Sequence, residues 1–392
     1  MATGNRTALW GSIAAVFITW VGVGTIIPVL PLFIKDRGAT YTLLGAIVAA
    51  SLVGHVVGQY PAGRLSDRLG RRPLMLGGLL LQAAAVAALL LPMPVVLLIG
   101  VRFLHGLGGA AFLPASRALV ADLVPPARRG TAYGWLSGAE MSGLVFGPAL
   151  GGLLALLGLA AVFEVTAGAT LLAALVLAWA LRAGEPLPGA SRPGFGWAPL
   201  GSRRAVLAVL AMAALTLGPN YLHGMYEVVW SLFMRGIGAS SFQIGASFSL
   251  FALPYVLLVP AAGRLADRYD RRWLAAASTA GAGLLAAVYP YLPGIPLVIA
   301  FCALEGAVVV FGIPAKNAFL MDAVPADRRG QVQGLIGAGS GLAAALAALV
   351  AGPQFQVAVP LAFFFAATVD LVLVLVALPL LAAAGAAERV PA

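Results

Sequence analysis

The stretch GRLSDRLGRR at residues 63–72 returns as GRLADRYDRR at residues 263–272. Both stretches gather arginine and aspartate in a chain where 61% of the residues are hydrophobic and only 10% are charged. A soluble globular domain has roughly 25% charged residues, so this chain could not cover a water-exposed surface. The composition therefore predicts an integral membrane protein, in which two polar stretches of the same pattern need an explanation.

Apolar runs of about 20 residues, the length that crosses the hydrocarbon core as a helix, recur along the whole chain. Reading them in order predicts an all-α membrane protein with twelve transmembrane helices. The expected spans are 8–32, 41–62, 73–93, 95–121, 131–156, 160–181, 205–230, 240–262, 273–293, 296–321, 331–352 and 358–383.

The formal net charge of +10 follows the predicted topology. Most of the 24 lysines and arginines fall in loops on one side, whereas Lys35, Arg37 and Arg235 fall on the other. The positive-inside rule makes the basic side cytoplasmic, with both termini inside, as expected for a multi-pass protein of the cell (inner) membrane. Basic residues are not interleaved with aromatic ones, so we expect no nucleic-acid partner. The single cysteine, Cys302, excludes an internal disulfide and a cysteine-based metal cluster.

The repeat extends beyond the polar stretches, with a constant offset of 200 residues between Asp67 and Asp267. Further matched pairs are Gly106 and Gly306, Pro114 and Pro314, Asp122 and Asp322, Pro125 and Pro325, Arg129 and Arg329, and Gly130 and Gly330. This register predicts two pseudo-symmetric six-helix bundles at residues 1–182 and 205–392, joined by a cytoplasmic linker at 183–204. A parallel repeat of this kind is typical of transporters that work by alternating access.

We expect the polar stretches to form a latch on the cytoplasmic face, in the loop between the second and third helices of each half. Asp67 can accept hydrogen bonds at a neighbouring helix N-terminus, and the arginines can bridge to Asp122. Such contacts must break when the transporter changes conformation. The predicted latch residues are Gly63, Asp67, Arg68, Arg71, Arg72, Asp122, Asp267 and Arg268. The alternative is a tight turn whose positive charges only set topology.

Four motifs of this sequence resemble the major facilitator superfamily, in particular its twelve-helix drug:proton antiporter (multidrug efflux) branch. They are GRLSDRLGRRPL from residue 63, GVGTIIPVLP from residue 22, LIGVRFLHGLGGAA from residue 98 and SGLVFGPALGG from residue 142. The second copy of the first motif has Asp270 where the family has glycine, and His105 stands where the branch usually has glutamine. The resemblance implies the major facilitator fold, drug export and a role for Arg102 in proton transfer.

The fifth predicted helix has glycines at Gly143, Gly147 and Gly151, one every four residues, followed by Gly152. This spacing predicts a seam without side chains that lets another helix approach closely. Pro148 removes one backbone hydrogen bond and permits a bend. Ordinary small-residue packing explains the same pattern, whereas the family resemblance implies an antiporter motif that seals against leak and sets the direction of export.

Carboxylates at bilayer depth cost about 2.5–3.5 kcal/mol or more, so each needs a reason. Glu140 falls on the face of the glycine seam, and Glu305 occupies the position that matches His105 in the other half. Glu227 shares one helical face with Asn220 and His223. We predict that Glu140, Glu227, Glu305, Arg102 and His105 couple transport to protons, with satisfied interhelical hydrogen bonds as the alternative. Structural roles are expected for Glu164 and Asp370.

Polar and aromatic residues of the inner helices suit amphipathic and cationic substrates, through stacking and cation–π contacts. The predicted cavity residues are Trp20, His55, Gln59, Asn220, His223, Tyr226, Trp230, Phe251 and Tyr255. The expected partners are small amphipathic or cationic substrates, protons and the lipid bilayer, with a monomeric protein and a proton gradient in place of a cofactor.

The leading interpretation is a secondary active exporter that exchanges protons for amphipathic organic compounds by alternating access. A lipid or lysolipid flippase is the alternative within transport, followed by a symporter for a small metabolite. A non-transporting receptor or scaffold would not need buried charges in the membrane. No nucleotide-binding site competes with this interpretation, because the sequence has no GxxxxGK[ST] motif. A membrane enzyme is least favoured, because the sequence has no nucleophile–base pair or metal-ligand spacing.

Overall fold

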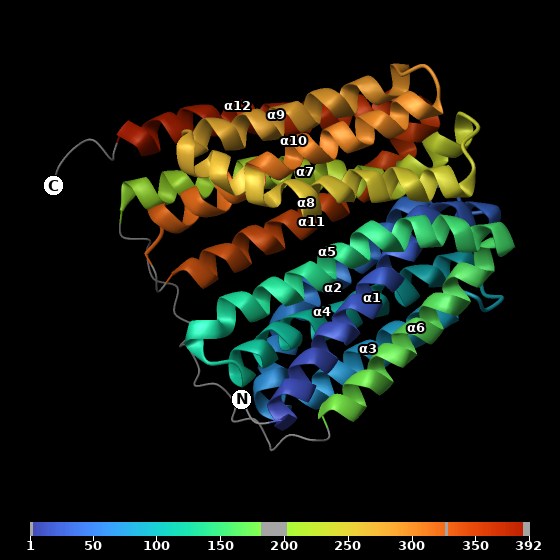
Figure 1. Ribbon diagram of the computed structural model, residues 1–392. Coiled ribbons are helices and arrows are strands. Elements are labelled where there is room, and N and C mark those ends of the chain that lie inside the picture. The colour runs from blue at the N-terminus through green and yellow to red at the C-terminus, as the bar shows by residue number, and fades with distance from the viewer. Residues whose placement is uncertain (1–2, 182–201, 326–327, 387–392) are drawn as a thin grey trace. The chain divides into compact units, whose positions relative to one another are not determined.

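The computed structural model describes residues 3–181, 202–325 and 328–386, and this part of the chain contains helices and no strand (Figure 1). The long helices of the first half are α1 (Thr3–Asp36), α2 (Tyr41–Leu69), α3 (Arg71–Ala88), α4 (Leu98–Leu123), α5 (Arg129–Leu154) and α6 (Leu159–Ala180). Those of the second half are α7 (Arg203–Gly236), α8 (Ser241–Arg268), α9 (Arg271–Val288), α10 (Ile295–Ala323), α11 (Arg329–Val357) and α12 (Val359–Ala386).

The helices form because a chain in hydrocarbon must satisfy every backbone N–H and C=O internally. In the described residues, 11 helical segments are long and apolar enough to cross a membrane. The remaining long helix is α3, which has 18 residues, begins with Arg71 and Arg72 and has Gln82 within its apolar run. The expectation of an all-helical membrane protein is confirmed.

The chain divides into two compact units. The first comprises Met1–Pro193 and Met234–Ser249, and the second comprises Gly194–Phe233 and Leu250–Ala392. The end of α7 and the start of α8 therefore belong to the unit formed by α1–α6. Of the predicted linker at 183–204, residues 183–201 lie outside the described part of the chain.

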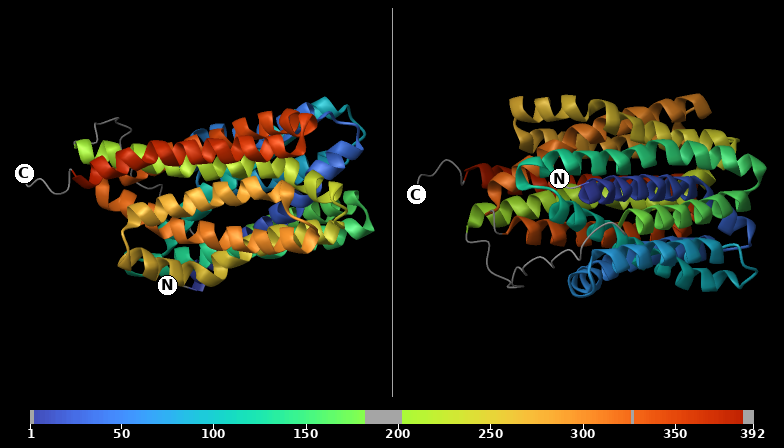
Figure 2. Two further views of the ribbon diagram at one scale, coloured as in Figure 1. Left: turned by 90° about the horizontal axis from the view of Figure 1, so that it is seen from above. Right: turned by 60° about the horizontal axis from the view of Figure 1, so that its bottom comes forward.

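In the first unit, α1 lies between α5 and α6, which the right-hand view of Figure 2 shows clearly. α2 packs on α4, and α3 packs on both α4 and α6. The core between them is formed by apolar side chains, including Val16, Met75, Phe112, Leu119 and Leu177.

In the second unit, α9 packs against α10 and α12, and α11 packs against α12. Its apolar core includes Met212, Leu215, Ala275, Leu320 and Leu381.

The polar stretches are helical over most of their length, although we predicted loops. α2 continues to Leu69 and α3 begins at Arg71, so the connection is Gly70 alone. Gly70 has φ +91°, a conformation that favours glycine. The second copy has no glycine there, and Asp270 instead caps the N-terminus of α9 by accepting a hydrogen bond from the Arg272 amide at 3.0 Å.

Candidate functional site

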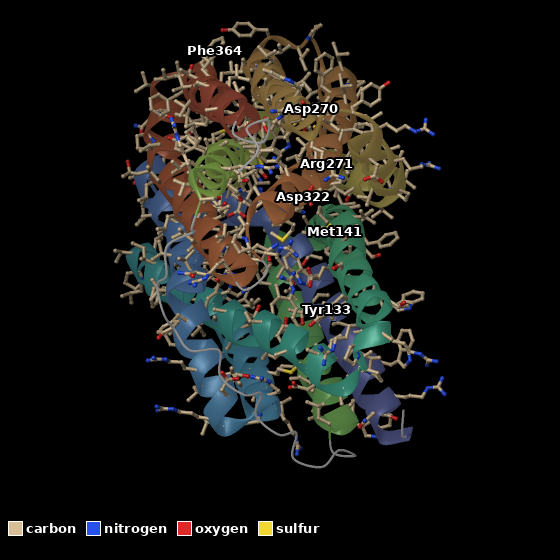
Figure 3. All side chains as sticks on the ribbon, turned by 90° about the vertical axis from the view of Figure 1, so that its left-hand side faces the viewer. Tyr133, Met141, Asp270, Arg271, Asp322 and Phe364 are labelled. Carbon is tan, nitrogen blue, oxygen red and sulfur yellow. The ribbon has the colours of Figure 1, made fainter. Side chains whose placement is uncertain are left out.

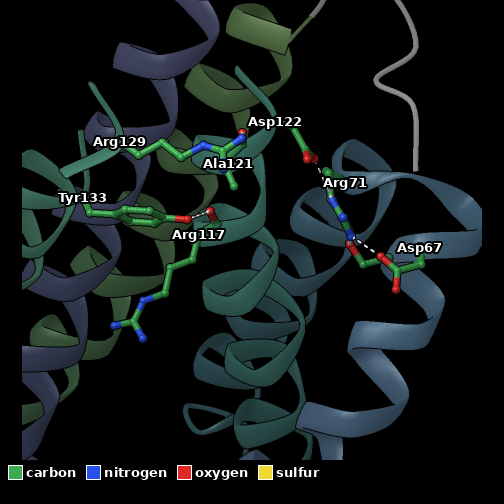
Figure 4. A network of polar contacts seen from close by, with 8 residues as sticks. Asp67, Arg71, Arg117, Ala121, Asp122, Arg129 and Tyr133 are labelled. Carbon is green, nitrogen blue, oxygen red and sulfur yellow. Dashed lines mark hydrogen bonds and ion pairs between the residues drawn. The ribbon is translucent and has the colours of Figure 1, made fainter. Parts of the chain in front are cut away.

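Arg71 is the centre of the polar network in the first unit (Figure 4). Its guanidinium donates to Asp67 at 2.6 Å, to Asp122 of α4 at 3.1 Å and to Ser66 at 2.8 Å. Arg71 is buried, whereas the Asp67 side chain is 43% exposed. The network therefore joins the end of α2, the start of α3 and the end of α4 through one buried arginine.

The second unit has a looser copy of this network. Arg271 donates to Asp322, and its distance to Asp267 is 3.4 Å (Figure 3 labels Asp270, Arg271 and Asp322). The Asp322 side chain is 59% exposed, compared with 15% for Asp122. Solvent therefore screens the contacts of the second copy more strongly.

The other predicted latch residues lie outside these contacts. Three of them are exposed arginines at helix ends: Arg68 at the end of α2, Arg72 at the start of α3 and Arg268 at the end of α8. Gly63 lies within α2, and no atom is within 4 Å of the place where its Cβ would stand. A tight turn or close approach therefore does not account for Gly63.

Arg102 and His105 of α4 are neighbours on one turn, with Arg102 Nη1 3.2 Å from His105 Nδ1. The same imidazole nitrogen lies 3.4 Å from the Ser51 hydroxyl of α2. A guanidinium can only donate, so the contact with Arg102 requires the tautomer in which Nδ1 accepts. Glycines bring the two helices together, since a Cβ at Gly106 would lie 2.0 Å from the Ser51 carbonyl oxygen.

Glu140 of α5 forms an ion pair with Arg117 of α4, whose Nη2 lies 3.0 Å from Oε2. The carboxylate is 7% exposed, and the arginine side chain is 54% exposed. Tyr133 donates to the backbone carbonyl of Arg117 at 3.1 Å and thereby fastens α5 to the same turn of α4 (Figure 4). Sequence reasoning missed Arg117 as a partner, although its position within a predicted span was a signal that it needed an anion.

The glycine seam of α5 faces α1. A Cβ at Gly143 would lie 2.5 Å from the Trp20 side chain, and one at Gly147 would lie 2.6 Å from the Val21 carbonyl oxygen. At Gly151 the nearest atom would be the Thr25 carbonyl oxygen at 2.3 Å. These distances are too short for any side chain, so the close approach of the two backbones depends on the glycines.

The end of the same helix contacts α8, within the first unit. A Cβ at Gly152 would lie 2.5 Å from the Ser241 carbonyl oxygen, and one at Gly245 would lie 2.2 Å from that of Pro148. The Ala149 amide, one residue after Pro148, donates to the Ser249 hydroxyl at 3.0 Å.

Glu305 of α10 is buried among aromatic rings of the second unit. It accepts hydrogen bonds from the hydroxyls of Tyr226 at 3.1 Å and Tyr289 at 2.7 Å. Trp230 packs edge-on against both tyrosines, and Phe363 of α12 completes the cluster. Tyr226 and Trp230, predicted for the substrate cavity, are therefore part of the enclosure of Glu305. Tyr289 was missed although it is only 16 residues from Glu305, because it lies in the short 3-10 helix Tyr289–Tyr291 after α9, where hydropathy does not specify the direction of a side chain.

The polar face of α7 contains a second carboxylate. His223 Nε2 lies 3.1 Å from Glu227 Oε1, and the His223 side chain is 54% exposed. Asn220 donates to the Thr216 carbonyl one turn earlier at 2.8 Å. Of the three residues predicted to share a face, His223 and Glu227 form an ion pair when the histidine is protonated. Asn220 contacts only the backbone of its own helix in the hydrogen bond described.

The remaining predicted cavity residues lie on two helices, α2 and α8. His55 of α2 faces Gly109 of α4, where a Cβ would lie 3.3 Å from His55 Nδ1. Gln59 is partly buried one turn further along α2. In α8 the rings of Phe251 and Tyr255 have centroids 5.9 Å apart. In the residues that the structure describes, no group of three or more histidine, cysteine or acidic side chains could hold a metal ion.

A family model of the Major Facilitator Superfamily matches residues 13–228 and 221–391, which together cover nearly the whole chain.

Curated relatives with similar sequences include multidrug resistance proteins. The chain is 32% identical to Multidrug resistance protein 2 of Bacillus subtilis (strain 168) over 167 residues, which is 43% of this chain and 42% of the relative. It is 30% identical to the Quinolone resistance protein NorA of Staphylococcus aureus (strain Mu50) over 140 residues, which is 36% of each chain. The matches therefore span well under half the length of these relatives.

Solved structures with the same fold include membrane transporters. The POT family transporter PepTSo aligns with a TM-score of 0.80 at 14% identity, over 97% of this chain and 98% of that one. An inward-facing bacterial homolog of the human lysosomal transporter Spinster aligns with a TM-score of 0.74 at 15% identity, over 98% of both chains. At these identities the likeness concerns the fold alone. Family model, fold and motifs agree, and the chain belongs to the Major Facilitator Superfamily of membrane transporters.

Proposed function

We propose that this transporter exports amphipathic, often cationic, organic compounds in exchange for protons. The names of the relatives, a multidrug resistance protein and a quinolone resistance protein, support the class of substrate. The protein would lie in the cell membrane with both termini in the cytoplasm, because the Arg71 and Arg271 connections are on the basic side of the predicted topology. Its energy source would be the proton gradient, without a cofactor.

The observation that best supports proton coupling is the environment of Glu305. This carboxyl is 3% exposed and contacts two hydroxyl groups rather than a cation. A tyrosine hydroxyl donates to the ionised carboxylate and can accept from the protonated acid. The enclosure can therefore hold both charge states, which a group that takes up and releases protons requires.

Glu140 and Glu227 differ from Glu305 because each has an ionisable base as partner, Arg117 and His223 respectively. In the proposed mechanism, uptake of a proton by either carboxyl releases its partner. Breaking the Glu140–Arg117 pair would loosen α5 from α4, and the Arg71 network would open and close as the latch of the same cycle. The Arg102–His105 pair would belong to the same proton pathway, as the family resemblance implies.

Substrate flux in reconstituted vesicles, with and without an imposed pH difference, tests the proposal. We expect Glu305→Gln to abolish the stimulation of ethidium flux by a pH difference, while ethidium still moves down its own gradient. Glu164→Gln is the matched control, because Glu164 is an exposed acidic residue of α6. Full pH-driven export by Glu305→Gln, Glu140→Gln and Glu227→Gln alike would contradict proton coupling and favour a uniporter or a lipid flippase.

A further inference from the structure

The second unit contains a further buried acidic group besides Glu305, and the two groups interact electrostatically. Asp370 of α12 is completely buried, and in the described part of the chain neither carboxyl oxygen accepts a well-formed hydrogen bond. The Gly283 amide gives it only a weak polar contact. A buried carboxyl with so few hydrogen bonds needs a compensating charge, because transfer from water is costly.

Glycines provide the space for this carboxyl. A Cβ at Gly218 of α7 would lie 2.4 Å from Oδ1 of Asp370, and one at Gly283 of α9 would lie 2.5 Å from Oδ2. The carboxyl group of α12 thus lies against the backbone of α7 and of α9, at positions that have no side chain. The fit is specific to glycine at both positions.

The compensating charge is Lys316 of α10, which interacts electrostatically with Asp370 without a direct ion-pair contact. The lysine ammonium is instead held by the Leu215 carbonyl of α7 at 3.2 Å. That carbonyl is available because its helical partner would be the amide of residue 219, and Pro219 has no N–H. Thr279 also donates to it, at 3.4 Å.

The first unit has no such charges at the equivalent positions. The residues that match Lys316 and Asp370 at the offset of 200 are Ser116 and Thr170. Both hydroxyls donate to carbonyls of their own helices, at 2.9 and 2.8 Å. Because the same fold is built without the charge pair in one half, the pair in the other half needs a reason other than folding.

Lys316 also lines a cavity of about 190 Å³ formed by α7, α10 and α11. Its polar lining residues are Thr216, Lys316, Asn317, Gln333 and Ser340, and no acidic residue lines it within the described ranges. The amides of Asn317 and Gln333 add hydrogen-bond donors to the lysine charge. The volume is below the roughly 300 Å³ of a small-molecule site, so the cavity suits one end of a larger molecule.

We propose that this cavity binds the anionic group of an amphipathic substrate, with Lys316 as its counter-ion and Asp370 as the internal carboxylate that competes for the same lysine. An ammonium has three donors, and the Leu215 carbonyl takes one of them. The remaining donors are at the cavity, where a ligand carboxylate can form charge-assisted hydrogen bonds. The inference extends the proposed export function to zwitterionic and anionic compounds, and rests on it for the class of ligand.

The test is equilibrium binding of rhodamine B, which has a free carboxylate, and of its ethyl ester, which lacks the carboxylate charge. We expect Lys316→Gln to weaken binding of rhodamine B about tenfold, the usual effect of losing one charge-assisted hydrogen bond. Binding of the ethyl ester should change less than about twofold. Asp370→Asn should act in the opposite direction and strengthen binding of rhodamine B, because it removes the competing carboxylate.

A double variant guards against misfolding. Lys316→Ser combined with Asp370→Thr installs the neutral pair of the first unit, so neither charge is left uncompensated. It should bind the ester like the parent protein and the acid as weakly as Lys316→Gln. Lys316→Arg should retain the preference for the acid. Equal changes for acid and ester in these variants, or a weaker rhodamine B complex in Asp370→Asn, would overturn the proposal and make the pair purely structural.

Fluorescence polarisation with purified protein in nanodiscs measures this binding without any gradient. A transporter that binds rhodamine B through Lys316 but shows no pH-driven flux would refute proton coupling and leave this inference standing. A transporter that shows pH-driven flux but binds rhodamine B independently of Lys316 would refute the Lys316 site and leave proton coupling standing.

Discussion

Single residues decide how strongly the two copies of the polar stretch hold their helices together. In the first copy Asp67 is 2.6 Å from Arg71, and in the second Asp267 is 3.4 Å from Arg271. Exposed ion pairs contribute about 0.2–1 kcal/mol each, so neither aspartate is expected to be essential for folding. Arg71 is buried and donates to three acceptors, so its replacement would leave all three without this donor.

Asp67→Asn should slow transport without weakening substrate binding, since it alters the latch and none of the residues predicted for the substrate cavity. Asp267→Asn should have a smaller effect because its contact is longer and more exposed.

Arg71→Gln should lower the free energy of unfolding by about 3 kcal/mol, as expected when one partner of a buried ionic network is removed. Flux, dye binding and thermal unfolding of the three variants check these expectations, and equal loss of binding and flux in Asp67→Asn would contradict the latch.

Asp270 shows how a residue that departs from the family pattern can serve the same connection. Hydrogen bonds from the Arg272 side chain lower the pKa of the Asp270 carboxyl below its ordinary value of 3.8. Because the folded-state pKa is lower than the unfolded one, this contribution to stability is complete above about pH 4 and is lost as the pH falls further. Asp270→Ala should cost about 1 kcal/mol of stability at neutral pH through loss of the N-cap. Thermal unfolding at neutral and acidic pH would check this, because the difference between parent and variant should shrink in acid.

At the scale of helices, α5 offers a matched test of the glycine seam. Gly147→Ala would place a Cβ 2.6 Å from the Val21 carbonyl oxygen and 2.7 Å from Gly24 Cα, so α1 and α5 must separate. Gly138→Ala lies on the same helix with no atom within 4 Å and should be neutral or slightly stabilising. We expect Gly147→Ala to lower the melting temperature by several degrees, roughly 1–3 kcal/mol. The same melting temperature for both variants would show that the two helices can adjust at no cost.

The helices also show how far sequence reasoning reaches. Hydropathy and the repeat were sufficient for an all-helical fold, because a chain in hydrocarbon has few alternatives. Local spacing placed Gly143 and Gly147 on one face, which the contacts with α1 match. Partners from neighbouring elements were not predictable: the pairing of Glu140 with Arg117 and of Glu305 with Tyr289 depends on helix rotations that no single helix specifies.

For the molecule as a whole, the asymmetry between the halves is the informative feature. The first half has the glycine seam and the tight Arg71 network, whereas the second has alanines at the matching seam positions and a looser network. The buried acid of the first half, Glu140, is paired with an arginine, whereas Glu305 and Asp370 of the second half have no direct ion pair among the described residues. The repeat thus supplies one scaffold, and substitutions at matched positions such as Ser116 and Lys316 give each half its own chemistry. Sequence reasoning assigned Asp370 a structural role because the last helix was expected to pack outside the helices that line the cavity.

The topology of the whole chain gives the last prediction. Cys302 is 3% exposed and is the only cysteine, so Cys302→Ala provides a cysteine-free background with little loss of contacts. In this background, cysteines at the exposed positions Arg68 and Arg268 should resist a membrane-impermeant maleimide in intact cells and react after permeabilisation. Leu157, which is 80% exposed at the opposite end of the first unit, should react without permeabilisation when replaced by cysteine. The charge asymmetry requires this result, because moving several arginines through the bilayer is far more costly than leaving them in the cytoplasm. If Arg68→Cys were labelled in intact cells, the connection between α2 and α3 would lie outside the cell. The predicted orientation, and the proposed direction of transport with it, would then be wrong.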